Sequence, residues 1–381
     1  MNVLFIGPCS SEWALRHAPV SLAATKWSEG FLRGLQNEAN VVVLTHSAER
    51  AWPIGRKIWR GYDARLFPDW VDCRAISYPP LKFIRELWLG MAYRTKVVDV
   101  IRERSIDVVF FYNCDARWQV STMRRIKTCF GGEVKVVPII LDGKDPNQGG
   151  WGWVKRAAHW SDAMVAMSVW LHERLPTVCG RPSYRLDSGA DTWHGVPPVS
   201  SSGEKVLVHT GSLDEMRGLD LMKGIVNHYA ESNVRFVFCG KETEMLLKHV
   251  FGDNPKVSLP GCVSADEMDR LCNGADVLLN VRDPNHPDNT VGFPSKISRY
   301  LSYGRPVVST RLQSLGVEYD EVIHFSEDNS VEAYCSLVDR LLALTDQERN
   351  EEYARLHDWF ETHKRWDVLT HGLLAWIKTL K

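Results

Sequence analysis

The amino-acid sequence predicts an α/β protein built from two Rossmann-like domains, and three observations lead to this prediction. The chain has 381 residues, which is too long for one ordinary core and suits two domains of common size. Short apolar runs alternate with helical patterns, as in parallel sheets whose strands are joined by helices. A serine- and glycine-containing stretch at residues 200–203 resembles a linker and divides the chain into halves.

The first half has the βαβ order of a parallel sheet. Helices are expected at residues 21–36 and 168–175, the second opened by Ser168 as N-cap. Strands are expected at residues 3–6, 41–44, 108–112, 134–141 and 163–167. We therefore expect an N-terminal Rossmann-like domain over residues 1–200.

A second series of strands follows the linker-like stretch. These strands are expected at residues 206–209, 234–239, 257–259, 277–281, 307–309 and 322–325. They predict a C-terminal Rossmann-like domain over residues 204–345. Residues 348–380 have an amphipathic helical pattern, so we expect a helical tail over residues 346–381. In two-domain proteins of this kind such a helix often crosses back over both domains.

The N-terminal sequence and the cysteine spacing favour a cytoplasmic protein. The first apolar run ends at Gly7 and Pro8, which is too short for a signal sequence or a membrane span. The nine cysteines are spaced singly, without a Cys-x-x-Cys pair, which indicates reduced thiols rather than a structural metal site.

The two halves differ in charge. Residues 1–200 hold 26 lysines and arginines against 19 acidic residues, and the remainder holds 20 against 28. One interpretation is that the basic half contacts an acidic acceptor or the inner face of an anionic membrane, for which Arg56, Lys57, Trp59 and Arg60 are candidates. The alternative is two solvated surfaces that merely differ. The fifteen tryptophans fit either stacking on sugar rings or ordinary core packing.

Two loops have the pattern of anion-binding sites. Gly211 and Ser212 follow a predicted strand and precede a helix, and Arg217 adds a cation. Ser295 and Lys296 begin a second predicted helix that ends at Gly304. The alternatives are a common glycine loop in the first case and an ordinary helix with a solvent-facing lysine in the second.

Several segments between residues 160 and 325 follow one another in a specific order. They include Asp-Ser-Gly-Ala-Asp at 187–191, the glycine loop at 211–218, Phe-Val-Phe-Cys-Gly-Lys at 236–241, Pro-Gly-Cys-Val at 260–263, Ala-Asp-Val-Leu-Leu-Asn at 275–280, and Phe-Pro-Ser-Lys with Gly-Arg-Pro-Val-Val at 293–308. This order resembles the retaining GT-B glycosyltransferases related to bacterial capsule and lipopolysaccharide enzymes. The N-terminal half resembles them only in its β-rich rhythm and in Glu-Gly-Phe at 29–31.

The resemblance implies two Rossmann-like domains that face each other across a cleft, with the acceptor on the N-terminal domain and a nucleotide-sugar donor on the C-terminal domain. It implies that the donor diphosphate meets Arg217, the backbone of Gly211 and Ser212, and the helix start at Ser295 and Lys296. The nucleotide base would lie near Gly240, Lys241 and Val263.

Three positions depart from the family pattern. Ser212 stands where the family has an arginine, and Val291 and Arg299 stand where it has two glutamates that hold the sugar and the ribose. Either Asp288 or Asn289 takes over part of the sugar recognition, or the donor is unusual, or transfer activity is lost. Arg299 would suit an additional negative charge on the donor; the alternative is that it pairs with a nearby acid.

The sequence thus predicts a retaining, metal-independent glycosyltransferase of polysaccharide biosynthesis, with Asp142, Arg217 and Lys296 as its catalytic residues. The resemblance implies a histidine or acidic residue after the strand that faces the cleft, and Asp142 stands in that region, although an aspartate there also caps turns. The expected partners are a nucleotide-sugar donor and a glycan or lipid-linked acceptor, without a further cofactor or nucleic acid. The alternatives are a catalytically degenerate binding or scaffolding protein and a nucleotide-sugar epimerase.

Overall fold

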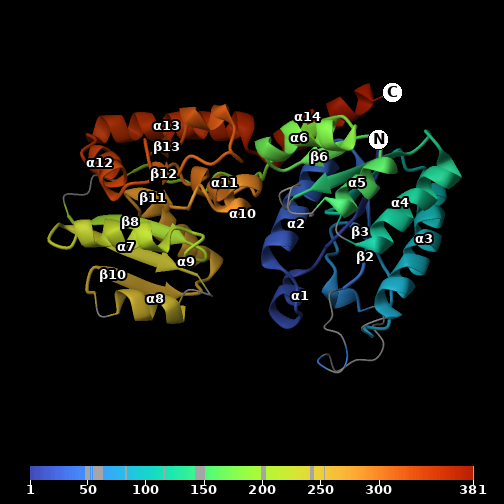
Figure 1. The fold of residues 1–381 in the computed structure, drawn as a ribbon, viewed down its shortest axis with the longest axis horizontal. Coiled ribbons are helices and arrows are strands. Elements are labelled where there is room, and N and C mark those ends of the chain that lie inside the picture. The colour runs from blue at the N-terminus through green and yellow to red at the C-terminus, as the bar shows by residue number, and fades with distance from the viewer. Residues whose placement is uncertain are drawn as a thin grey trace. The chain divides into compact units, whose positions relative to one another are not determined.

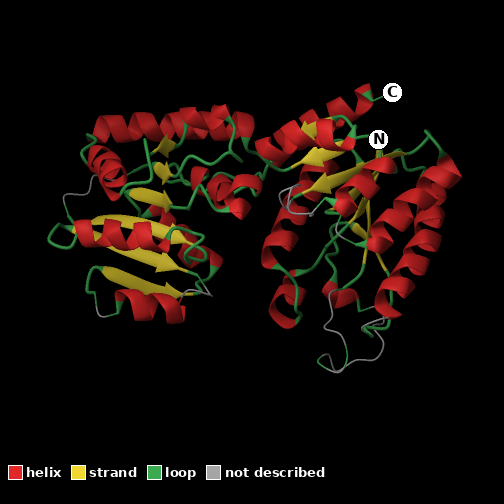
Figure 2. Ribbon diagram, viewed as in Figure 1, coloured by secondary structure: helices red, strands yellow, loops and turns green. Residues whose placement is uncertain are grey.

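The computed structural model describes residues 1–47, 52, 54, 63–81, 84–114, 116–141, 151–198, 203–240, 244–252 and 254–380. The chain forms two compact units (Figure 1). Unit 1 contains Met1–Gly189 and Trp366–Lys381, and unit 2 contains Ala190–Arg365. Figure 2 shows each unit as a sheet with helices packed around it. No helix within the described ranges is long and apolar enough to cross a membrane.

Unit 1 is built on a seven-stranded sheet in the order β3-β2-β1-β4-β5-β6-β7, and every neighbouring pair is parallel. Its strands are β1 (Asn2–Ile6), β2 (Asn40–Thr45), β3 (Asp72–Ala75), β4 (Val108–Tyr112), β5 (Lys135–Ile140), β6 (Met164–Ala166) and β7 (Ser183–Arg185). Its helices are α1 (Glu12–His17), α2 (Leu22–Gln36), the 3-10 turn η1 (Ala64–Leu66), α3 (Ile84–Arg104), α4 (Arg117–Phe130), α5 (Gly152–His159), α6 (Val169–Cys179) and α14 (Trp366–Thr379). The central strands are buried on both faces, which explains their continuous apolar sequences.

Unit 2 is built on a six-stranded parallel sheet in the order β10-β9-β8-β11-β12-β13. Its strands are β8 (Lys205–Thr210), β9 (Val234–Cys239), β10 (Val257–Gly261), β11 (Val277–Asn280), β12 (Val307–Ser309) and β13 (His324–Phe325). Its helices are α7 (Leu219–His228), α8 (Glu244–Phe251), α9 (Ala265–Asn273), α10 (Pro287–Val291), α11 (Lys296–Leu301), the 3-10 turn η3 (Val317–Glu321), α12 (Val331–Leu342) and α13 (Asp346–His363).

Both sheets contain the Rossmann strand order, which confirms the predicted fold class of two parallel-sheet domains. In each sheet the order reverses between the first strand and the fourth, which are β1 and β4 in unit 1 and β8 and β11 in unit 2. Ligands of such sheets bind beyond the carboxyl ends of the strands at this switch point. The fold therefore offers one candidate position in each unit.

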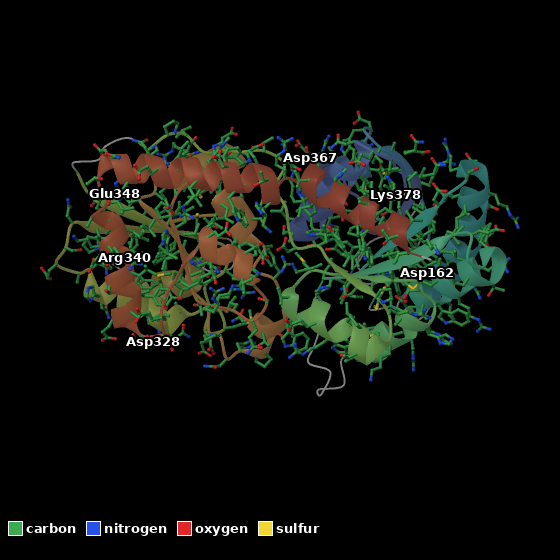
Figure 3. The ribbon with its side chains drawn as sticks, turned by 90° about the horizontal axis from the view of Figure 1, so that it is seen from above. Asp162, Asp328, Arg340, Glu348, Asp367 and Lys378 are labelled. Atoms are coloured by element: carbon green, nitrogen blue, oxygen red, sulfur yellow. The ribbon has the colours of Figure 1, made fainter. Side chains whose placement is uncertain are left out.

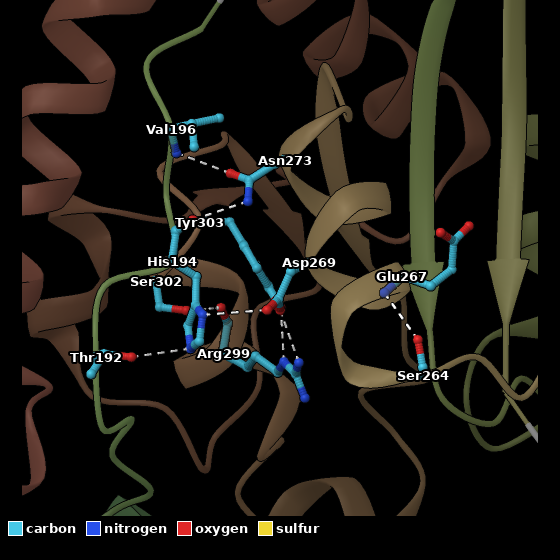
Figure 4. Close-up of polar contacts among 10 residues, drawn as sticks. All are labelled: Thr192, His194, Val196, Ser264, Glu267, Asp269, Asn273, Arg299, Ser302 and Tyr303. Carbon is cyan, nitrogen blue, oxygen red and sulfur yellow. Dashed lines mark hydrogen bonds and ion pairs between the residues drawn. The ribbon is translucent and has the colours of Figure 1, made fainter.

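The division between the units lies before Ala190, whereas the sequence predicted it at residues 200–204. Figure 4 shows the polar contacts that tie this segment to unit 2: the His194 N–H donates to the Ser302 carbonyl at 2.8 Å, and Asn273 bonds the backbone of His194 and Val196. The Arg305 guanidinium donates to the carbonyls of Val196 and Asn273 at 2.6–3.0 Å. These long-range bonds hold the segment against unit 2, and no local composition signals them.

The predicted tail at residues 346–381 is also divided. Helix α13 belongs to unit 2, where the Trp193 indole N–H donates to the Tyr353 hydroxyl at 3.0 Å. Helix α14 belongs to unit 1, where the Trp366 ring meets Trp27 and Phe31 of α2 edge-on at centroid distances of 5.4 and 6.4 Å. The last helix therefore completes the hydrophobic core of the first unit.

Candidate functional site

The carboxyl edge of the unit 2 sheet brings three glycine-containing strand ends together. The Gly211 N–H donates to the Cys239 carbonyl at 2.7 Å, and the Gly240 N–H donates to the Gly261 carbonyl at 3.0 Å. A Cβ on Gly240 would lie 2.7 Å from the Gly211 carbonyl oxygen, so only glycine fits. The loops after β8, β9 and β10 therefore lie side by side, and they carry Gly211, Gly240 and Val263, whose contacts with a donor stay predictions.

The loop between β8 and α7 places Arg217 at this edge. Asp214 accepts a hydrogen bond from the Arg217 backbone at 3.0 Å, and its other carboxylate oxygen pairs with the Arg217 guanidinium. Gly218 then begins α7 with a φ of 79°, and a Cβ there would lie 2.7 Å from a methyl group of Val281. The loop is thereby packed closely against the residues that follow β11.

Arg282, which the sequence analysis missed, lies just beyond β11 in this region. Its Nη1 donates to the Asn289 Oδ1 at 2.8 Å, and its backbone exchanges two hydrogen bonds with the Thr310 hydroxyl at 2.8 and 3.0 Å. Its Nε is buried and has no hydrogen-bond partner among the described residues. Burial, and next the charge of Arg217, lower the pKa of Arg282 to about 10.

Lys296 approaches the same edge from α11. Its Nζ lies 3.1 Å from the Nε2 of His209. Burial, followed by the charges of Arg282 and Arg217, lowers the pKa of Lys296 well below its usual value. Burial and then Lys296 likewise lower the pKa of His209, so its ring is neutral. The Leu279 carbonyl lies 3.1 Å from the His209 Nδ1 and the Ser212 carbonyl lies 3.4 Å from its Nε2, so each ring nitrogen has a carbonyl acceptor within reach.

Arg217, Arg282 and Lys296 are together termed the cationic cluster. The charge of Arg217 lowers the pKa of Arg282, and the charges of Arg282 and Arg217 lower the pKa of Lys296. The only nearby acid that opposes this effect on both Arg282 and Lys296 among the described residues is Asp214, which already pairs with Arg217. Cations that are gathered at a partly buried edge with so little neutralisation favour an anion. The arrangement therefore suits a ligand with more than one negative charge.

The structure brings most of the predicted donor-site residues to one edge of unit 2. Ser212 and the N-cap Ser295 lie in the loops that carry Arg217 and Lys296, and Ser295 caps α11 without a side-chain hydrogen bond. Lys241 and Asp142 lie outside the described residues, as do the membrane candidates Arg56, Lys57, Trp59 and Arg60. Their predicted roles stay predictions.

Asn289 was predicted to help recognise the donor sugar, but its amide is engaged within the protein. Its Nδ2 donates to the carbonyls of Met216 and Asp283 at 2.8 and 2.7 Å, while its Oδ1 accepts from Arg282. Both amide protons are used, so Asn289 orients Arg282 and the loop before α7 rather than offering a donor to a ligand. Val291, at the position of a family glutamate, is 2% exposed within the hydrophobic interior.

Arg299 pairs with an acid, which is the alternative that the sequence left open. Figure 4 shows its guanidinium beside Asp269: the Nη2–Oδ1 distance is 3.1 Å, and the Nε donates to the Tyr303 hydroxyl at 2.8 Å. The Tyr303 hydroxyl donates to the same carboxylate at 2.6 Å, and His194 lies 3.6 Å from its other oxygen. This network joins α9, α11 and the segment before β8. A contact of Arg299 with the donor stays a prediction.

Within the described ranges, no group of three or more histidine, cysteine, aspartate and glutamate side chains is arranged to hold a metal ion. The nine cysteines are all described, and none forms a disulfide.

Comparisons with known proteins agree with this architecture. Residues 204–343 match the family model described as glycosyl transferases group 1. No curated protein sequence matches the chain.

Three solved structures show the same fold. Sucrose-phosphate synthase from Thermosynechococcus elongatus is 12% identical with a TM-score of 0.66, covering 100% of this chain and 99% of that one. The lipopolysaccharide outer core galactosyltransferase WaaB is 12% identical with a TM-score of 0.65, covering both chains fully. Anabaena Alr3699/HepE, in complex with UDP and glucose, is 13% identical with a TM-score of 0.62 and the same coverage. The chain therefore has the GT-B fold, and unit 2 contains a segment similar to the group 1 glycosyl transferases.

Proposed function

We propose that the protein is a glycosyltransferase that binds the diphosphate of a nucleotide-sugar donor at the cationic cluster of unit 2. The observation that carries the proposal is the position of Arg217, Arg282 and Lys296 at the switch point between β8 and β11, where Asp214 is the carboxylate of the described residues that opposes their charge. The group 1 match over the same unit supports a sugar donor.

The cluster suits the departure of a nucleoside diphosphate. When the bond between the sugar and the diphosphate breaks, negative charge develops on the leaving phosphate oxygen, and fixed cations in a partly buried site stabilise it. An anion beside Lys296 raises its proton affinity, so the ammonium form is favoured in the complex. The neutral ring of His209, whose Nε2 lies 3.1 Å from the Lys296 Nζ, adds no charge of its own beside this amine. The acceptor hydroxyl bonds to the anomeric carbon on the face from which the diphosphate departs, and its proton passes to a base on the acceptor side, where Asp142 is the proposed group.

Neutralisation by three cations makes a metal ion unnecessary for this step, and we extend the proposal to metal-independent transfer with retention of configuration. Polysaccharide or lipopolysaccharide assembly in the cytoplasm is the proposed setting. The comparison with the galactosyltransferase WaaB supports this setting at the level of fold alone.

A binding protein with a degenerate donor site is a second candidate, because Val291 is buried and Arg299 is held by Asp269 where the family has glutamates. Turnover separates the candidates. A transferase consumes a nucleotide sugar only when an acceptor is present, an epimerase converts it without one, and a binding protein leaves it unchanged.

The first experiment is a thermal-shift panel of UDP, GDP, ADP, CMP and TDP sugars. A ligand at one hundred times its dissociation constant adds about 2.7 kcal/mol of stability, which such a panel detects. Arg217→Ala should weaken binding of the tightest-binding nucleotide sugar by about 1.5–3 kcal/mol, which is the contribution of one charge-assisted hydrogen bond. Lys223→Ala is a matched control, because Lys223 also pairs with an aspartate three residues before it, at 2.8 Å, but lies on α7. Equal affinity for both variants would remove the cationic cluster from the donor site.

A further inference from the structure

Unit 1 contains a cavity at the corresponding edge of its own sheet. The cavity has a volume of about 230 Å³ and is lined by residues that follow β1 and β2 and end β4, namely Gly7, His46 and Tyr112. It thus lies at the switch point of the unit 1 strand order, where α/β sheets bind ligands. Its volume is below the roughly 300–1,000 Å³ typical of sites for drug-sized ligands, which suits a single sugar ring.

Arg85 places a positive charge at this cavity. It lies in the first turn of α3, with its guanidinium carbon 5.5 Å from the centre of the Tyr78 ring. Its Nε is buried, and among the described residues it has neither a hydrogen-bond partner for that atom nor a carboxylate in ion-pair range. A buried N–H that loses water without gaining an acceptor is costly, so this nitrogen favours a bound acceptor group.

The N-terminus of α2 contributes independently to the same cavity. Ser21, Ala24 and Thr25 of this helix line it. Helix α2 spans Leu22–Gln36, long enough for its aligned peptide dipoles to place partial positive charge at its first turn. Ser21 caps only the Ala24 N–H, at 3.3 Å, and the first N–H groups of any helix have no carbonyl within the helix. The helix start and Arg85 therefore favour one and the same kind of ligand, an anion.

The remaining wall is neutral and aromatic. Burial, followed by the charge of Arg85, lowers the pKa of His46 to about 3, so its ring is uncharged. Its Nδ1 lies 2.8 Å from the Tyr93 hydroxyl, and Tyr93 stacks on Trp118 with ring centroids 4.2 Å apart. A neutral imidazole and aromatic faces suit hydroxyl groups and the apolar face of a sugar ring.

We propose that this cavity binds the acceptor, and that the acceptor is a small sugar carrying a phosphate or carboxylate group held by Arg85 and the N-terminus of α2. The inference rests on the proposed function, because it names the substrate class of the same reaction. Phosphate and carboxylate both present oxyanions, and the test distinguishes between these two groups.

The test titrates the full chain with glucose 6-phosphate, glucuronate and neutral glucose by calorimetry. At least one anionic probe should bind at least tenfold more tightly than glucose, and the stronger of the two identifies the group as phosphate or carboxylate. Arg85→Gln should weaken that probe at least tenfold. Arg94→Gln is the matched control, since Arg94 lies on the same helix and its Nε donates to the Gly90 carbonyl at 3.0 Å; it should bind the probe as wild type does.

A chemical measurement on the wild type keeps the test valid if Arg85→Gln does not fold. Arginine modification by phenylglyoxal, mapped by mass spectrometry, should be slowed at Arg85 by the bound probe and unchanged at Arg94. Three results would overturn the proposal: glucose and both anions bind equally, neither anion binds, or Arg85→Gln binds the anionic probe as tightly as the wild type. So would displacement of the anionic probe by UDP alone.

Nucleotide binding is measured in parallel on Arg85→Gln and Arg94→Gln and should be unchanged in both. If the wild type binds no nucleotide in the donor panel, the proposed function fails. If it binds nucleotide but no anionic sugar, the acceptor inference alone fails.

Discussion

Replacing Arg282 by glutamine should weaken nucleotide binding while leaving the ligand-free protein as stable or more stable. Glutamine keeps a polar side chain next to Asn289 but removes the charge from the cationic cluster. A lost charge-assisted contact of about 1.5–3 kcal/mol corresponds to roughly a 10- to 150-fold rise in the dissociation constant of a nucleoside diphosphate.

The effect on the free energy of unfolding has the opposite sign, because burial in the folded protein disfavours the charged form of Arg282. The pKa of Arg282 falls from its usual 12.5 to about 10, chiefly through burial. One pKa unit corresponds to about 1.4 kcal/mol, so removing the charge should stabilise the folded protein by on the order of 3 kcal/mol. Loss of the 2.8 Å bond to Asn289 costs about 1–3 kcal/mol. The free energy of unfolding should therefore stay level or rise by up to about 2 kcal/mol.

Urea denaturation of the ligand-free protein and calorimetry with the best nucleotide measure the two effects. Arg340→Gln is the control, because Arg340 is exposed on α12 (Figure 3) and should change neither quantity. Unchanged nucleotide affinity in Arg282→Gln, together with a fall in stability of more than about 2 kcal/mol, would show that Arg282 serves only the fold.

Three further predictions concern local structure. Gly218→Ala should lower the free energy of unfolding by about 1–3 kcal/mol in urea, because its φ is 79° and the added Cβ meets Val281; a neutral result would argue against this loop geometry. Arg299→Ala should cost no more than about 1 kcal/mol of stability, since its pair with Asp269 is half exposed; it should weaken nucleotide binding if the predicted contact with the donor forms, and unchanged affinity would remove Arg299 from the donor site. His46 has a folded pKa of about 3, below the unfolded value of 6.5, so its stabilising contribution is complete above pH 6.5 and decreases as the pH falls toward 3. Between pH 7 and 5 the wild type should lose about 2 kcal/mol more than His46→Gln in the same urea assay, and parallel losses would contradict the buried neutral ring.

The fold was predictable because the central strands of each sheet have continuous apolar sequences, which the pattern along the chain shows directly. The edge strands β3 and β7 have polar, half-buried sequences and were missed. The division between the units was not, since it depends on hydrogen bonds from Arg305 and Asn273 to a segment far away in sequence. The serines and glycine of residues 200–203 are a local signal of an irregular stretch. They do not tell which unit holds the residues before it.

The site was predictable where a local pattern carries it. Gly211 lies in a glycine loop and Lys296 at a helix start, and a few consecutive residues are enough to recognise each pattern. Arg282 was missed because its role depends on β11 lying beside β8, and these strands are not consecutive in the chain. The available signal was a charged residue directly after a buried strand. Asp269, which holds Arg299, likewise lies on a separate helix, and no spacing rule connects the two.

The return of the chain to unit 1 as α14 has a consequence for how the protein is made. Unit 2 is one continuous stretch and can fold as soon as that stretch has left the ribosome. Unit 1 is interrupted by it, and the face of Trp27 and Phe31 stays uncovered until Trp366, near the end of synthesis, arrives to cover it. The N-terminal unit, although translated first, is thus the last to be completed, and its aromatic face is the surface that a chaperone would have to protect in the meantime.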